Sequence, residues 1–299
     1  MKKLFIFLVI TFLLGCNQTD FKKSTHIIPS KEITIKDFLG GSFTPQKMNS
    51  LNSMNGDYYS LLNRDKNGNS TIDKYHYSSL KKVATIVDGK NLEGIHNFRT
   101  YDFNKDETKV ILGKNIQPIY RRSKKGTYYV LSLESKKLHF IDKDILEPTF
   151  SPDGQKIAYV KKNNLFVLDL TSYQKTQITK DGAINSIING ISDWVYEEEF
   201  GFVRAFEWNA NSSSIAFLRF DETKVREYSM GITGNQLYPQ EYIFKYPKAG
   251  EENAKVTLHI YHLKNRVTKK IELKNYEYIP RIKWSNKKNI LILEEQKPK

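Results

Sequence analysis

Cysteine is nearly absent from this chain, since Cys16 is the one cysteine among 299 residues. A disulfide framework and a zinc site built from several cysteines are therefore excluded. The chain also lacks a run of about 20 apolar residues, which a helix needs to cross a bilayer. It has no His-Glu-x-x-His, no Walker loop and no Gly-x-Gly-x-x-Gly, so we expect neither a metal nor a cofactor.

Arginine is scarce in spite of a formal net charge of +14. Only 9 of the 47 basic residues are arginine, and the lysines are scattered as singles and pairs. Proteins that read nucleic acid favour clustered arginine, whose planar fork matches phosphates and guanine edges. The charge therefore indicates a lysine-rich solvated surface, and we expect no nucleic-acid partner.

The first sixteen residues have the pattern of an export signal. A positive start precedes the apolar run Leu4–Leu14, which has the length of a signal-peptide core. It ends in Leu-Leu-Gly-Cys, which resembles the lipobox of bacterial lipoproteins. We predict a signal peptide at 1–15, lipidation of Cys16, a tether at 16–35, and anchoring on the exported side of a cell-envelope membrane. The alternative is an ordinary secretory signal with a chance cysteine.

The body of the chain repeats an aromatic residue, a polar turn and paired strands. The clearest copy begins at Phe150 with Phe-Ser-Pro-Asp-Gly, in which proline and glycine favour a tight turn. The spacings are 49, 47, 58 and 76 residues, and the two shorter ones are typical of a propeller blade. We predict an all-β fold, a partial β-propeller of four-stranded blades, with insertions between 170 and 208 and between 220 and 256. A β-sandwich is the alternative. Related turns begin at Met54, Phe103, Trp208 and Trp284.

The first insertion contains Asp-Trp-Val-Tyr-Glu-Glu-Glu at 193–199. This resembles the double-glutamate motif of the dipeptidyl peptidase IV family, and the stretches at 119–123 and 227–262 resemble that family too. The resemblance implies that Glu198 and Glu199 hold the amine of a peptide with a free N-terminus. It also implies that Arg121 contacts a peptide carbonyl, with Arg122, one position along, as the alternative.

Two carboxylates suit an ammonium group because charge-assisted hydrogen bonds are short and strong. Neighbouring residues point to opposite faces of a strand but lie about 100° apart on a helix, where they can converge. We therefore predict a short helical insertion at 193–200, capped by Ser192 or Asp193. The alternative is a solvated acidic run without a ligand.

The resemblance also implies features beyond the amine site. The segment 227–247 resembles an arm that many family members use for dimerisation, so we expect a homodimer. The family's serine nucleophile sits in a Gly-x-Ser-x-Gly elbow on an α/β-hydrolase domain, and this sequence has no such elbow. We therefore expect residues 36–299 to form an incomplete propeller that is inactive by itself. The alternatives are a non-catalytic, lipid-anchored propeller that binds peptides or partner proteins, and a general propeller scaffold of the cell envelope.

Overall fold

The computed structural model describes residues 32–45, 50–285 and 290–297. The chain divides into two compact units, residues 1–48 and 49–299. The signal peptide, Cys16 and most of the tether lie outside the described residues. The predicted propeller region, residues 36–299, begins within the first unit, and the blades lie in the second.

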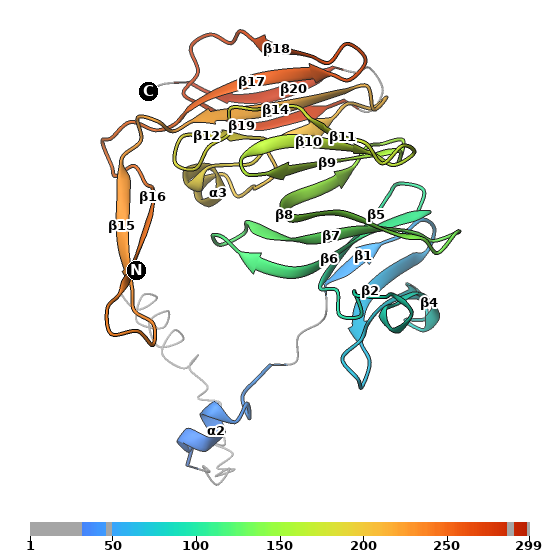
Figure 1. Ribbon diagram of the computed structural model, residues 1–299. Coiled ribbons are helices and arrows are strands. Elements are labelled where there is room, and N and C mark those ends of the chain that lie inside the picture. Colours follow the sequence, from blue (N-terminus) through green and yellow to red (C-terminus); the bar gives the residue numbers. More distant parts are fainter. Residues whose placement is uncertain (1–31, 46–49, 286–289, 298–299) are drawn as a thin grey trace, which may run out of the picture. The chain divides into compact units, whose positions relative to one another are not determined.

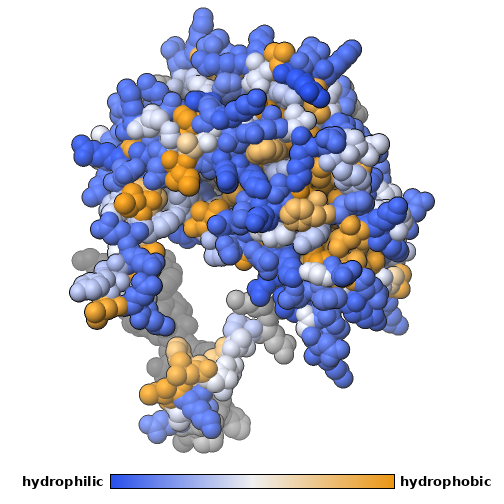
Figure 2. Space-filling model, viewed as in Figure 1, coloured by the Kyte–Doolittle hydropathy of each residue, from blue (hydrophilic) through white to orange (hydrophobic). Residues whose placement is uncertain are grey.

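Among its described residues, 32–45, the first unit contributes one short helix, α2 (Ile35–Leu39). Thr34 caps it, and the Thr34 hydroxyl and the Asp37 carboxylate exchange hydrogen bonds with each other's backbone in a capping box. This segment exposes most of its apolar side chains (Figure 2). Phe38, for example, is 73% exposed. The helix is therefore stabilised by its cap and not by burial.

The second unit is built from antiparallel sheets that follow one another along the chain (Figure 1). The first sheet, blade 1, has four strands in the order of the sequence. Each strand is joined to the next by a short turn, as expected for a propeller blade. Blade 1 comprises β1 (Leu51–Ser53), β2 (Tyr58–Arg64), β3 (Ser70–His76) and β4 (Lys82–Asp88), followed by the 3-10 turn η1 (Gly89–Asn91).

The second sheet has seven strands because two blades share one long strand, β8 (Leu138–Phe150). Its first part pairs with β7, up to Ile145, and its second part pairs with β9, from Ile145 onward. We call the sheet from β5 to the first part of β8 blade 2, and the sheet from the second part of β8 to β11 blade 3. The ladder shifts register in both parts of β8, and Asp144 and Glu147 have positive φ, so the strand bends from blade 2 into blade 3. The other strands are β5 (Thr100–Phe103), β6 (Lys109–Pro118), β7 (Lys124–Ser132), β9 (Lys156–Lys161), β10 (Asn164–Asp169) and β11 (Lys175–Gln177).

Blade 4 is the third sheet, and both predicted insertions interrupt it. Two short strands, β12 and β13, pair along the same strand β14, and helix α3 lies between them in the sequence. A separate two-stranded arm, β15–β16, lies between β14 and β17. The elements are β12 (Ile187–Asn189), α3 (Trp194–Glu199), β13 (Phe206–Trp208), β14 (Ser214–Asp221), β15 (Glu227–Ile232), β16 (Gln240–Lys245), β17 (Lys255–His262) and β18 (Val267–Ile271); β19 (Tyr278–Trp284) and β20 (Leu291–Gln296) pair separately.

The core lies between successive blades. The middle strands are buried on both faces, as in β9, where the four residues from Ile157 to Val160 are all buried. One cluster joins blades 1 and 2 around Phe98, and another joins blades 3 and 4 around Phe206. This stacking and the four-stranded blades confirm the predicted partial propeller, and a β-sandwich is not what forms.

The repeated turn keeps one backbone pattern in blades 2, 3 and 4. The first residue donates its N–H to the carbonyl oxygen five positions later, and the fourth residue has positive φ. The predicted sequence repeat is thus a repeat of structure. The donor and acceptor pairs are Asn104 and Lys109 (3.0 Å), Ser151 and Lys156 (2.8 Å), and Asn209 and Ser214 (3.0 Å), and the fourth residues are Glu107, Gly154 and Ser212.

Neighbouring turns also contact each other through that fourth residue. The Glu107 carboxylate accepts a hydrogen bond from the N–H of Asn55, in the turn of blade 1. The Ser212 hydroxyl accepts one from the N–H of Asp153, in the turn of blade 3, at 3.0 Å. The turns of blades 1 and 2, and those of blades 3 and 4, are therefore joined by hydrogen bonds in addition to the apolar core.

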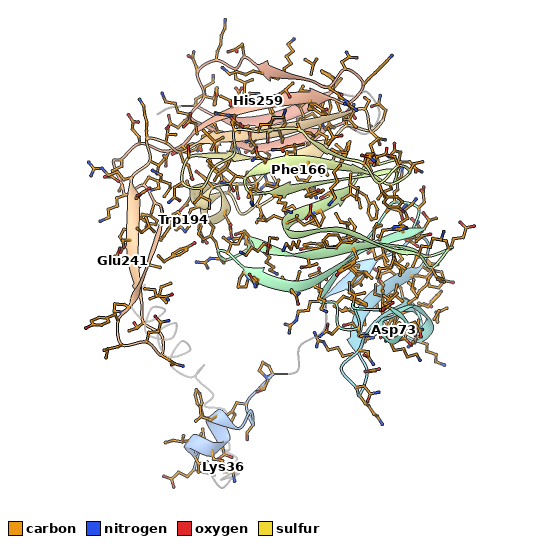
Figure 3. All side chains as sticks on the ribbon, in the orientation of Figure 1. Lys36, Asp73, Phe166, Trp194, Glu241 and His259 are labelled. Carbon is orange, nitrogen blue, oxygen red and sulfur yellow. The ribbon has the colours of Figure 1, made fainter. Side chains whose placement is uncertain are left out.

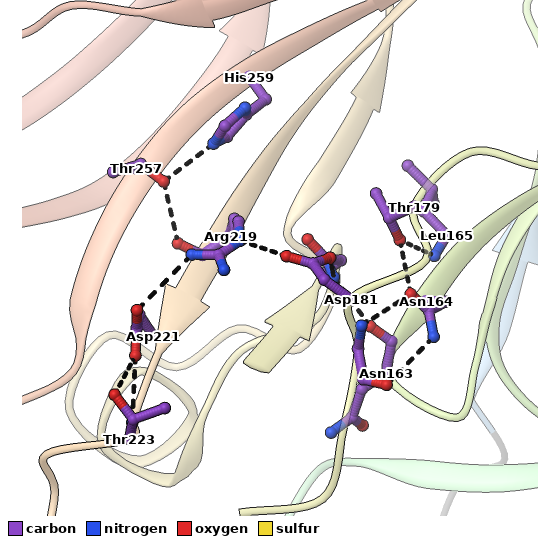
Figure 4. A network of polar contacts seen from close by, with 12 residues as sticks. Asn163, Asn164, Leu165, Thr179, Asp181, Arg219, Asp221, Thr223, Thr257 and His259 are labelled. Atoms are coloured by element: carbon purple, nitrogen blue, oxygen red, sulfur yellow. Dashed lines mark hydrogen bonds and ion pairs between the residues drawn. The ribbon is translucent and has the colours of Figure 1, made fainter. Parts of the chain in front are cut away.

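A polar network ties the loop after β11 to blades 3 and 4 (Figure 4). Arg219 on β14 places its Nε 2.7 Å from Oδ2 of Asp181, and the other oxygen of Asp181 accepts from the Asn189 amide at 2.9 Å. On β17, the Thr257 hydroxyl lies 2.9 Å from Nε2 of His259. Burial, with the positive charge of Arg219 nearby, lowers the pKa of His259. The network therefore links the loop that follows β11 of blade 3 to β12 and β14 of blade 4. Strand β12 is the one that leads into α3.

Candidate functional site

The predicted site helix sits on a short stem that rises from the inner edge of blade 4. The N–H of Ala205 donates to Gly190 O at 2.9 Å, and the N–H of Ser192 donates to Val203 O at 2.8 Å. Ile191 and Arg204 form an antiparallel bridge between these two bonds. The chain therefore leaves blade 4 and returns to it through a paired stem, which fixes the base of the insertion.

Helix α3 confirms the predicted helical conformation of the motif. Asp193, one of the two predicted caps, accepts a hydrogen bond from Tyr196 N through Oδ1 at 2.9 Å. Burial raises the pKa of Asp193 to about 6. The buried or half-buried side of the insertion carries Asp193, Tyr196, Glu197 and Phe200, which follow the i, i+3, i+4, i+7 spacing of one helix face.

Tyr196 fixes the rotation of the helix. Its side chain is 1% exposed, and its hydroxyl accepts a hydrogen bond from Ile279 N on β19 at 3.0 Å. Its ring packs edge-on against Phe220 of β14. With this face turned inward, the following residues Glu198 and Glu199 face outward.

The three consecutive glutamates lie in three different environments. Glu197 is fully buried, the Glu198 side chain is 17% exposed, and Glu199 is exposed. Glu197 Oε1 accepts hydrogen bonds from the backbone N–H groups of Arg122 (2.5 Å) and Ser123 (2.8 Å). Glu197 thus faces the turn between β6 and β7, away from the other two glutamates.

Arg121 and Glu198 meet across the site. Arg121 Nε lies 3.1 Å from Oε1 and 2.8 Å from Oε2 of Glu198, while the Arg121 side chain remains 72% exposed. Arg122 points elsewhere and donates from Nη1 to the carbonyl oxygen of Glu197 at 3.1 Å. The structure therefore brings Arg121 and Glu198 together, with the exposed Glu199 next to Glu198 in the helix, and of the two arginines it is Arg121 that faces Glu198.

The arm approaches the other side of the helix. The centroid of the Trp194 ring lies 4.4 Å from that of Tyr246, which follows β16. Figure 3 shows Trp194 on the side of α3 that faces the arm. Nearby Glu222 is 6% exposed, and burial, together with the charge of Asp193, raises its pKa to about 7. The sequence did not single out Glu222 or Tyr246, because neither lies in a recognisable motif.

Nothing in the described part of the chain suggests a metal or membrane-spanning site. No group of three or more His, Cys, Asp or Glu side chains there is placed to hold a metal ion. Among the same residues, no helix has the length and apolar character needed to cross a membrane.

Known proteins similar to this chain share one family. Residues 104–297 match the sequence profile of the dipeptidyl peptidase IV N-terminal region. The chain is 30% identical over 234 residues to prolyl endopeptidase FAP from Homo sapiens, and 33% identical over 219 residues to a probable dipeptidyl-aminopeptidase B from Tuber melanosporum. These alignments cover 77% and 64% of this chain.

The fold agrees with the sequence match. The crystal structure of dipeptidyl peptidase 4 from Porphyromonas gingivalis superposes with a TM-score of 0.82, at 33% identity and over 88% of this chain. The chain spans 38% of that protein, and 30% and 24% of the human and Tuber relatives. It thus corresponds to about a third of the length of these proteins, and it belongs to the dipeptidyl peptidase IV family, as its N-terminal region.

Proposed function

We propose that Glu198, Glu199 and Arg121 hold the free N-terminus of a peptide, as the recognition part of a serine exopeptidase that releases dipeptides. The observation that carries the proposal is the contact between Arg121 and Glu198 beside the exposed Glu199. Two carboxylates and one guanidinium have a formal charge of −1. A peptide ammonium group, at +1, would neutralise the site.

The roles within the site follow from exposure. Glu199 is exposed and can accept hydrogen bonds from an ammonium group directly. Glu198 already accepts a hydrogen bond from Arg121 Nε, and its two oxygens can accept further hydrogen bonds. The remaining guanidinium nitrogens of the exposed Arg121 can donate to a peptide carbonyl.

Calorimetric titration of the chain with the tripeptide Ala-Pro-Ala tests this proposal. N-acetylation of the peptide removes the ammonium charge and should abolish binding. Glu199→Gln and Glu198→Gln should each weaken binding by about tenfold or more, since a charge-assisted hydrogen bond is worth more than 1.4 kcal/mol. Glu134→Gln, on an exposed turn of blade 2, is the matched control and should bind as the wild type does. Equal binding of free and acetylated peptide would rule out amine recognition.

Cleavage would need groups that the 299 residues do not contain in a recognisable motif, because they hold no Gly-x-Ser-x-Gly. The alternative function is therefore a non-catalytic propeller that binds peptides or partner proteins. Release of p-nitroaniline from Gly-Pro-p-nitroanilide by the purified chain tests whether this polypeptide is active by itself. We expect no release, and activity that is lost in Glu199→Ala would contradict this.

We also propose that the chain is anchored in the cell envelope through lipid on Cys16. The lipobox-like sequence supports this, and residues 1–31 lie outside the described structure. Metabolic labelling with an alkyne fatty acid should mark the wild-type chain and not Cys16→Ser. Equal labelling of both chains would overturn the anchor.

A further inference from the structure

Glu197 is fully buried without an ion-pair partner among the described residues, unlike Glu198 beside it. Burial of a carboxylate is costly unless hydrogen bonds replace its water. Glu197 Oε1 meets this requirement with two backbone donors, the N–H groups of Arg122 and Ser123, while the buried Oε2 has no hydrogen-bond partner in the described part of the chain. The side chain therefore has a structural partner 75 residues away in the sequence, on blade 2.

The contact is reciprocal. The Glu197 carboxylate accepts hydrogen bonds from the N–H groups of Arg122 and Ser123. In return, Arg122 Nη1 donates a hydrogen bond to the backbone oxygen of Glu197 at 3.1 Å. This use of Arg122 leaves Arg121 as the arginine that faces Glu198. The helix on blade 4 and the turn on blade 2 are thus each bound by a side chain of the other.

The turn itself is already closed by local bonds. Ile119 N donates to Ser123 O at 2.9 Å, and Tyr120 N donates to the Ser123 hydroxyl at 3.1 Å. These bonds define the shape of the turn but do not connect it to α3. Within the described residues, the hydrogen bonds that join a backbone group of the turn or of α3 to the other element involve Glu197, whereas Arg121 and Glu198 meet through their side chains.

We propose that Glu197 is a positioning residue that holds the 119–123 turn so that Arg121 stays against Glu198. This inference rests on the proposed function, since it assigns a role in the same amine site. Glu197 does not contact the peptide. It acts through Arg121, because the two N–H groups that it fixes directly follow that residue in the chain.

Peptide titration of Glu197 variants tests the inference. Glu197→Ala removes the acceptor and should weaken Ala-Pro-Ala binding by about tenfold or more. Glu197→Gln keeps an acceptor oxygen for both N–H groups and should bind within about threefold of the wild type. Glu197→Asp, a smaller change that preserves the charge, retracts the carboxylate by one methylene and should bind weakly despite its charge. Unfolding midpoints establish that each variant is folded.

A double-mutant cycle separates positioning from direct contact. In an Arg121→Ala background, Glu197→Ala should change affinity by less than about twofold, since the residue that it positions is gone. A tenfold loss in both backgrounds would overturn the inference, as would a glutamine variant as weak as alanine with aspartate retaining affinity. The last pattern would mean that the charge of Glu197 acts on the peptide itself.

Amide hydrogen exchange gives a readout that does not depend on peptide. The N–H groups of Arg122 and Ser123 should be protected in the wild type and in Glu197→Gln, and should exchange about tenfold faster or more in Glu197→Ala. Unchanged protection in the alanine variant would overturn the positioning role. If the wild-type chain binds no free-amine peptide, the proposed function fails, and the exchange result still decides whether Glu197 holds the turn.

Discussion

A Cβ atom added to Gly154 would lie 2.7 Å from Nδ2 of Asn104. These residues belong to the corner turns of blades 3 and 2, and Gly154 has φ +64°. The Asn104 amide is not free to move away, because its Nδ2 donates to the Thr108 hydroxyl at 3.0 Å and its Oδ1 accepts from Lys109 N at 2.7 Å. The row of turns therefore depends on glycine at this point.

Gly154→Ala should destabilise the protein by about 2–3 kcal/mol in urea unfolding, because strain at positive φ adds to the contact with Asn104. Gly94→Ala is the matched control: Gly94 has φ +71°, and nothing lies within 4 Å of its added Cβ. This variant carries the backbone cost alone, about 1 kcal/mol. Equal losses in the two variants would show that the turns do not press on each other.

Tyr196→Phe should cost about 1–3 kcal/mol, because it leaves the N–H of the buried Ile279 without its acceptor. Ile279 lies where the β19–β20 ladder shifts register, so its N–H depends on the tyrosine oxygen. Tyr276→Phe also removes one hydroxyl bond, to Val256 O, but at a half-buried site. Chemical denaturation of both variants should give the larger loss at Tyr196, and the reverse order would contradict this role.

Glu222→Gln should stabilise the chain at pH 8 and not at pH 4.5. The pKa of Glu222 rises from 4.5 to about 7 on folding, so between these values the folded state holds a proton that the unfolded state has lost. Stability therefore falls as the pH rises through this range, and the amide removes that loss, a gain of about 1–3 kcal/mol. Urea midpoints at the two pH values measure it, and a gain that is the same at both would contradict the shift.

The arm should mediate a homodimer, as its resemblance to the family's dimerisation arm implies. Its tip exposes Leu237 (90%) and Tyr238 (77%), and Figure 2 shows apolar side chains at the end of the arm. Light scattering should give about twice the chain mass of 34.9 kDa for the wild type and a single chain for Leu237→Glu. Val267→Glu, an equally drastic change on an exposed strand of blade 4, should remain dimeric. A monomeric wild type would exclude the dimer.

Much of the fold could be read from the sequence, because a propeller repeats its turn chemistry. The turns at Met54, Phe103 and Phe150 gave the blade spacing, and the longer spacings correctly located the helix and the arm. The sharing of β8 could not be foreseen. It depends on a bend within one continuous strand, whose sequence carries Pro148 but no glycine and no run of turn residues that separates the two blades.

The sequence predicted which residues form the site, but not which way each of them faces or what it contacts. The motif identified the glutamates, whereas only the structure shows that Glu197 faces inward and that Arg121 faces Glu198 while Arg122 does not. A signal for Glu197 was present, since it shares a helix face with Tyr196 and Phe200. The sequence did not reveal it, because buried carboxylates are rare and three adjacent glutamates are therefore expected to be exposed.

The stem that carries α3 has a consequence for how this surface can vary. Asn189 and Phe206, at its two ends, pair with Arg219 and Phe217, which are only two positions apart on β14. An excursion that starts and finishes at almost the same point on a sheet can lengthen, shorten or change its tip without altering the spacing of the strands beneath it. The exposed end of the insertion can therefore differ between relatives while the strands of blade 4 keep their pairing, and Tyr196 anchors the helix to the core beneath it.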